Sequence, residues 1–88
     1  MGVYNATFPK GSRVRVVSKV ALEAFLQDWK YHHKLKPEQL EYAGAMATVK
    51  EVGFYHGGDQ LYVLENVPGI WNLPCIESAQ GTEAWLEM

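Results

Sequence analysis

The sequence predicts a small, mainly β domain in which four to five short strands close into a barrel and one helix is inserted after the first strand. The chain of 88 residues has room for a single domain. Short stretches rich in β-branched and aromatic residues alternate with turns that contain Gly or Pro. Closure of such strands into a barrel removes the exposed sheet edges.

The first strand and the helix follow each other directly. Residues 13–16 alternate, which places Val14 and Val16 on one face and the two arginines on the other. From Ser18, a good N-cap, the apolar residues change to helical spacing. We expect a helical insertion at about residues 19–35, with lysines near its C-terminus and Pro37 beyond its end.

The rest of the chain is predicted to be β. Residues 37–42 suit one further helical turn, and residues 47–55 read as a strand with a bulge or bend at Gly53. A Gly-Gly hairpin at 57–58 leads to a return strand at 60–65.

Two further turns complete the predicted domain. Pro68-Gly69 fits a type II turn before a short strand at 70–73, and a tight turn leads into a last strand. The domain is expected to span residues 1–77, followed by a C-terminal tail, 78–88, in which Trp85 suits docking on a partner.

Several segments resemble known small barrels. They are the Phe-Pro-Lys-Gly-Ser-Arg-Val-Arg-Val run of residues 8–16, the Tyr-Ala-Gly of 42–44, the Gly-Gly hairpin and Ile70-Trp71. In this order they resemble SH3-like small β-barrel proteins, distantly the barrel domain of the nitrile hydratase β subunit. Residues 5–8, 13–15, 52–55, 62–65 and 68–69 are locally similar to the cassette-borne type II dihydrofolate reductases.

This resemblance covers about half of the 88 residues and implies a fold and a possible mobile gene cassette origin, but no activity. The reductases build their site from Val-Gln-Ile-Tyr, whereas residues 70–73 here read Ile-Trp-Asn-Leu. Nitrile hydratase chemistry belongs to a metal site on its other subunit. Neither active site therefore transfers.

The composition excludes several classes of protein. One cysteine rules out an intramolecular disulfide. The sequence contains no apolar run long enough to span a bilayer and begins without the pattern of a signal peptide. We therefore expect a cytoplasmic protein with no membrane partner.

Neither a metal, a cofactor nor a catalytic group is predicted. On a helix, the adjacent His32 and His33 would point about 100° apart and would not chelate one ion together; a three-histidine site with His56 is the alternative. Cys75, His56 and Asp59 are together the residue types of a catalytic thiol triad. The position of Cys75 between Pro74 and Ile76 favours a buried structural thiol instead.

The aromatic residues suggest a ligand-binding face between the inserted helix and the barrel. Its candidate residues are Trp29, His33, Tyr55, His56, Trp71 and Asn72. The alternative is that Trp29 and Trp71 only seal the core beneath the helix.

The charges are divided along the chain. Residues 1–36 carry seven Lys/Arg against two carboxylates, a balance of +5, and residues 37–88 carry one lysine against eight carboxylates, a balance of −7. Arg13 and Arg15 form a possible basic contact face, but the acidic remainder disfavours nucleic acid. The opposed charges can compensate within one chain or attract a second copy.

We therefore expect a non-enzymatic binding or interaction module that forms a homodimer or higher homo-oligomer and recognises a protein or a small-molecule ligand through its aromatic face. A small oligomeric barrel enzyme with a shared pore site and a nucleic-acid-binding barrel remain the alternatives.

Overall fold

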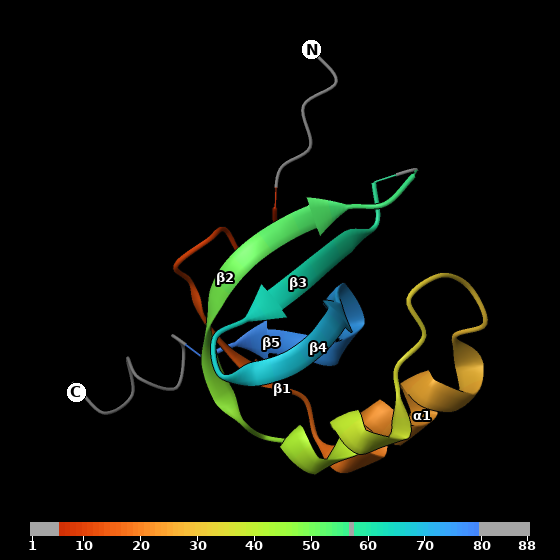
Figure 1. The fold of residues 1–88 in the computed structure, drawn as a ribbon. Coiled ribbons are helices and arrows are strands. Elements are labelled where there is room, and N and C mark those ends of the chain that lie inside the picture. The colour runs from red at the N-terminus through yellow and green to blue at the C-terminus, as the bar shows by residue number, and fades with distance from the viewer. Residues whose placement is uncertain (1–5, 57, 80–88) are drawn as a thin grey trace.

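The protein folds as one antiparallel sheet with a helical segment packed beside it (Figure 1). The computed structural model describes residues 6–56 and 58–79. Its elements are β1 (Arg13–Val16), α1 (Lys19–Asp28), η1 (Pro37–Tyr42), β2 (Met46–Phe54), β3 (Gln60–Leu64), β4 (Val67–Asn72), η2 (Leu73–Cys75) and β5 (Ile76–Ser78), where η1 and η2 are 3₁₀ turns.

The prediction of a mainly β fold with one helix is confirmed, but the closed barrel is wrong. The strand order is β4-β3-β2-β1-β5, which leaves β4 and β5 at the two ends, and no ladder joins them in the described part of the chain. The physical reason lies in these two strands. β5 has only three residues, and β4 contains Pro68, which has no amide hydrogen for a ladder.

The long strand β2 connects the two halves of the sheet. Its first half pairs with β1 and its second half with β3 (Figure 1). The register shifts between Val49 and Glu51. The bulge therefore lies here and not at Gly53, which pairs in register with Leu61.

The predicted alternation of the first strand is confirmed, since Val14 and Val16 are fully buried. They share the core with Leu22 of α1, Tyr62 of β3 and Trp71 of β4. Each of these side chains is 0% exposed, so the helix and the sheet enclose one apolar core.

Helix α1 begins as predicted and ends earlier than predicted. The Ser18 hydroxyl accepts a hydrogen bond from the Ala21 amide at 3.2 Å. The helix stops at Asp28, and Trp29 is already extended, so the lysines expected in its last turn lie outside it. In a helix continued to residue 35, Leu35 would lie roughly 220° from Leu22 around the axis. The chain leaves the helix and buries Leu35 in the core instead.

The turn predicted at Pro68-Gly69 is also displaced. The chain reverses at Glu65 and Asn66, which has a φ of 65°, and Pro68-Gly69 lies inside β4. The pairing of β3 with β4 shifts its register between Tyr62 and Leu64, so Pro68-Gly69 lies in a β-bulge of β4. Gly69 keeps its positive φ of 102°, with the side chain of Gln39 directly against it.

The ends of the expected domain differ slightly from the prediction. Ser78 belongs to β5 and Ala79 is buried, so the first two residues of the expected tail pack with the sheet. The predicted docking of Trp85 and the turn residue Gly57 lie outside the described residues. None of the helices in the described ranges has the length and apolar composition to cross a membrane.

The close contact between Gly69 and Gln39 can be tested by substitution of the glycine. A Cβ at Gly69 would lie 2.7 Å from the Gln39 Nε2 and would sit on a backbone with positive φ. We expect Gly69→Ala to lower the free energy of unfolding by about 2 kcal/mol, as measured by urea denaturation. Gly53→Ala is the matched control, because nothing lies within 4 Å of its Cβ position; equal losses would contradict this role of Gly69.

Candidate functional site

The loop that follows α1 and the end of β2 form one cluster of rings, which we call the aromatic–histidine surface. Its members are Trp29, His32, His33, Tyr55 and His56. The His32 and Tyr55 rings stack with their centroids 3.8 Å apart and their planes at 14°. His33 and His56 each meet Tyr55 edge-on, at 5.5 and 5.0 Å. Trp29 meets His32 in the same way at 5.4 Å.

A chain of polar contacts runs through this surface. Nε2 of His32 lies 2.9 Å from the Asp59 carboxylate, and Nδ1 of His32 lies 3.0 Å from Nδ1 of His33. The His32 side chain is 11% exposed, whereas Asp59 and His33 lie toward solvent. Because a carboxylate can only accept a hydrogen bond, Nε2 of His32 carries the hydrogen that is donated to Asp59. Nδ1 of His32 then faces Nδ1 of His33.

The backbone of the two histidines is held from inside the molecule. The Trp29 indole donates to the His32 carbonyl at 2.6 Å, and the Asn72 amide donates to the His33 carbonyl at 2.8 Å. His33 has a φ of 47°, in the left-handed region that residues other than glycine seldom adopt. The hydrogen bond from buried Asn72 therefore helps to hold this unfavourable conformation in place.

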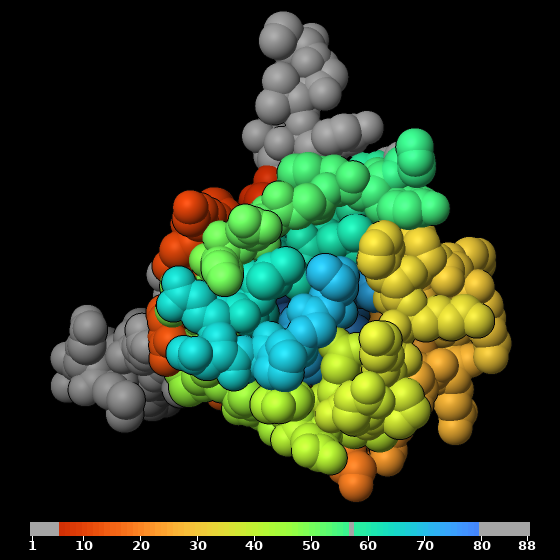
Figure 2. All heavy atoms as spheres, in the orientation of Figure 1, coloured from red at the N-terminus to blue at the C-terminus, as the bar shows by residue number. Residues whose placement is uncertain are grey.

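Beside this surface lies a cavity of about 480 Å³ between the segment 33–42 and β4. Figure 2 shows this face, where the residues after α1 border those of β4. The lining residues are His33, Lys34, Lys36, Glu38, Gln39, Glu41, Tyr42, Pro68, Gly69 and Ile70.

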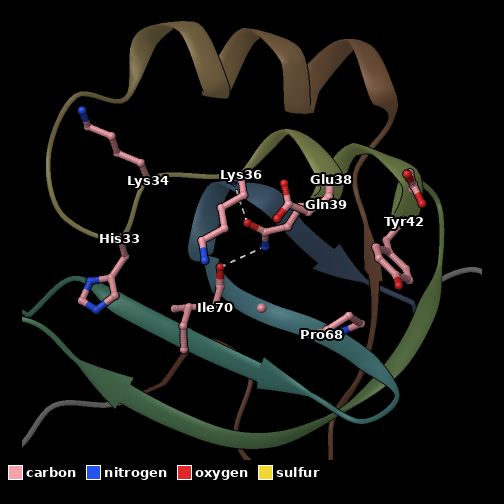
Figure 3. A pocket seen from close by; sticks show the side chains of 10 residues that line it. His33, Lys34, Lys36, Glu38, Gln39, Tyr42, Pro68 and Ile70 are labelled. Atoms are coloured by element: carbon pink, nitrogen blue, oxygen red, sulfur yellow. Dashed lines mark hydrogen bonds between the residues drawn. The ribbon is translucent and has the colours of Figure 1, made fainter.

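The lining of the cavity combines apolar surface with charged side chains of both signs. In Figure 3, His33 and Lys34 lie toward one end, Lys36 lies in the middle beside Gln39, and Tyr42 and Pro68 lie toward the other end. Glu38 and Glu41 add negative charge to the η1 side. The arrangement suits a ligand with an apolar body and polar or charged ends.

Gln39 joins the two walls of the cavity. Its Nε2 donates to the Ile70 carbonyl at 3.2 Å, and its Oε1 accepts from the Lys36 amide at 2.8 Å (Figure 3). The side chain is only 4% exposed. It therefore fixes the width of the cavity and gives the Ile70 carbonyl of β4 a partner.

The structure brings together most of the residues that the sequence suggested for a ligand-binding face. Trp29, His33, Tyr55 and His56 lie on the aromatic–histidine surface, and Asn72 supports it from below. Trp71 does not reach it: the ring is fully buried, and its Nε1 has no hydrogen-bond partner within the described residues.

Sequence reasoning missed His32 as a member of this face and, apart from His33, missed the residues that line the cavity. The adjacent histidines were visible in the sequence, but a helix extending to residue 35 placed them apart. The cavity residues come from the loop before η1, from η1 itself and from β4, and no local sequence pattern predicts that these segments are joined through Gln39.

The two arginines of the possible basic face already have partners within the chain. The Arg15 Nε lies 3.0 Å from the Glu77 carboxylate, and the Arg13 guanidinium donates to the Thr48 hydroxyl at 3.2 Å. They are therefore less available to phosphates than two free guanidinium groups would be.

Cys75 lies in the core, where burial raises the pKa of its thiol to about 12. A thiol with such a pKa is neutral near pH 7 and has little nucleophilic character. Its position agrees with the structural thiol expected from its neighbours in the sequence.

Comparisons of the chain with protein-family models, curated proteins and solved structures found no match.

The support beneath the histidines can be tested through Asn72. We expect Asn72→Leu to lower the free energy of unfolding by about 1–2 kcal/mol, because the His33 carbonyl loses its buried donor. Hydrogen exchange of the amides in residues 30–36 should become faster. Asn66→Gly, an exposed turn position with positive φ, is the control; unchanged exchange in the leucine variant would contradict the supporting role.

Proposed function

We propose that this protein is a small binding module that holds a ligand in the cavity between the segment 33–42 and β4, next to the aromatic–histidine surface. The observation that carries this proposal is the cavity itself. Its volume of about 480 Å³ falls within the range of small-ligand sites. Tyr42, Pro68 and Ile70 supply apolar surface, and charged side chains surround it.

The proposal includes an SH3-like architecture. What supports it is the strand order β4-β3-β2-β1-β5, in which the last strand returns beside the first, together with the 3₁₀ turn η2 before β5. The sequence resemblance to SH3-like small barrels points in the same direction. A shared fold carries no activity, so the binding function is argued from the cavity alone.

The charges around the cavity narrow the class of ligand. Lys34, with Lys36 next to it along the wall, favours an anionic group toward the His33 end, while Glu38 and Glu41 of η1 favour a cationic group nearer Tyr42. We therefore expect a ligand with an apolar body and opposite charges at its ends, such as an amino-acid-like molecule or a short peptide of a protein partner.

Ligand binding can be tested by observing the backbone amides of the isotopically labelled protein by NMR while small zwitterions and short peptides are added. We expect shifts confined to residues 33–42 and 68–70. Lys36→Gln should weaken binding of ligands with an anionic group by about 3- to 10-fold, the effect of one partly solvated charge.

Lys19→Gln is the control for this measurement, because it removes an exposed lysine that does not line the cavity. Equal weakening by both variants would point to nonspecific charge attraction. Shifts spread over Arg13, Arg15 and the other strands on addition of a single-stranded oligonucleotide would favour the nucleic-acid alternative instead.

We also propose that the module self-associates. Several large apolar side chains are exposed, with Val20 at 76% and Tyr31 at 70%. Exposed lysines on and after α1 are complementary in charge to exposed glutamates of β2 and η1, which suits contact between two copies.

Self-association predicts a mass in solution of at least twice the 9.9 kDa of one chain. Size-exclusion chromatography with light scattering should show this mass at low ionic strength and a smaller one in about 1 M salt, where charge attraction is screened. A strict monomer at all salt and protein concentrations would contradict the proposal and also the shared-pore enzyme.

A further inference from the structure

We propose that His32 and His33 form a two-nitrogen binding site for a divalent transition-metal ion, with Asp59 positioning His32. This metal site does not depend on the proposed ligand cavity, although His33 belongs to the metal site and also lines the cavity. Its central feature is the approach of the two Nδ1 atoms to 3.0 Å. Sequence reasoning excluded such a site on the assumption that these residues are helical, and the structure places them in a loop.

The separation of the two nitrogens matches chelation in neighbouring coordination positions. For metal–nitrogen bonds of about 2.0–2.1 Å, two atoms 3.0 Å apart subtend an angle of about 90–100° at the ion. This angle fits adjacent corners of a square-planar or octahedral ion more closely than a tetrahedron. Imidazole nitrogens in that arrangement are typical of Cu²⁺ and Ni²⁺.

Asp59 prepares His32 for this role. Because the carboxylate accepts the hydrogen of Nε2, the lone pair of the neutral His32 ring is on Nδ1, which faces His33. A carboxylate on the far nitrogen of a metal-binding histidine fixes its tautomer and orientation and raises its basicity. Without an ion, the two Nδ1 atoms are joined by one hydrogen bond, and an ion bound to both nitrogens replaces that hydrogen bond and lies to one side of the line between them.

The surroundings hold the pair in position before any ion arrives. The stacked Tyr55 ring fixes the plane of His32, and the Trp29 and Asn72 side chains hold the two carbonyls. The backbone of His33 has a φ of 47°, and the ring meets that of His32 edge-on with the centroids 5.2 Å apart. Such preorganisation reduces the entropy that a ligand site loses on binding.

The described residues contain no group of three His, Cys, Asp or Glu side chains able to hold an ion. The protein therefore supplies two nitrogens, and water or an added ligand takes the remaining positions. We expect weaker binding than in a closed four-ligand site, but with one ion per chain and a clear preference for Cu²⁺ and Ni²⁺ over Ca²⁺ and Mg²⁺, which favour oxygen.

The test is calorimetric titration of the full, tag-free chain with Cu²⁺ and with Ni²⁺, with electron paramagnetic resonance of the copper form. The expected result is one equivalent bound, with a spectrum that shows coupling to imidazole nitrogen. His33→Asn should weaken binding at least tenfold, since asparagine tolerates positive φ but lacks the imidazole. Asp59→Asn should weaken it by about 10-fold or more through His32.

His56→Asn is the matched control, because it removes an exposed histidine of the same surface that has no part in the pair. Circular dichroism of each variant establishes that the fold is intact. No binding by the wild-type chain, or the same affinity in the wild type and in His33→Asn, would overturn the proposal. So would an equal loss in His56→Asn, which would indicate diffuse binding by exposed histidines.

Discussion

Two buried amide side chains, Gln39 and Asn72, hold the irregular segment after α1 against the edge strand β4. They are the buried polar side chains of the described core. Gln39 of η1 donates to Ile70 of β4, and Asn72 of β4 donates to His33. Because an unpaired buried amide is costly, each side chain specifies a single position for the segment it contacts.

The cavity and the histidine pair both follow from this attachment. Gln39 sets the distance between η1 and β4, and so the space that Tyr42, Pro68 and Ile70 line. Asn72, the last residue of the same strand, donates to the His33 carbonyl and so positions the loop that carries the two histidines. The edge strand β4, which would otherwise present unpaired backbone groups, thereby becomes one wall of the cavity.

The division of charge along the sequence is partly balanced in the fold. Arg15 of the basic first third pairs with Glu77 of the acidic remainder, and Asp59 of that remainder accepts a hydrogen bond from the neutral ring of His32. Both pairs join residues far apart in the chain. The three lysines of the segment 30–36 remain exposed, and Lys34 and Lys36 line the cavity. The net charge of −2 therefore conceals local fields of both signs.

Local patterns in the sequence determined the elements and most of the core. Alternation predicts the buried Val14 and Val16, and Ser18 predicts the helix start, because each rests on neighbouring residues. The end of the helix, the bulge at Pro68-Gly69, the open sheet and the meeting of His32 with His33 were decided only by the tertiary structure. They depend on contacts such as Gln39 with Ile70 and Asn72 with His33, 31 and 39 residues apart, which no local pattern encodes.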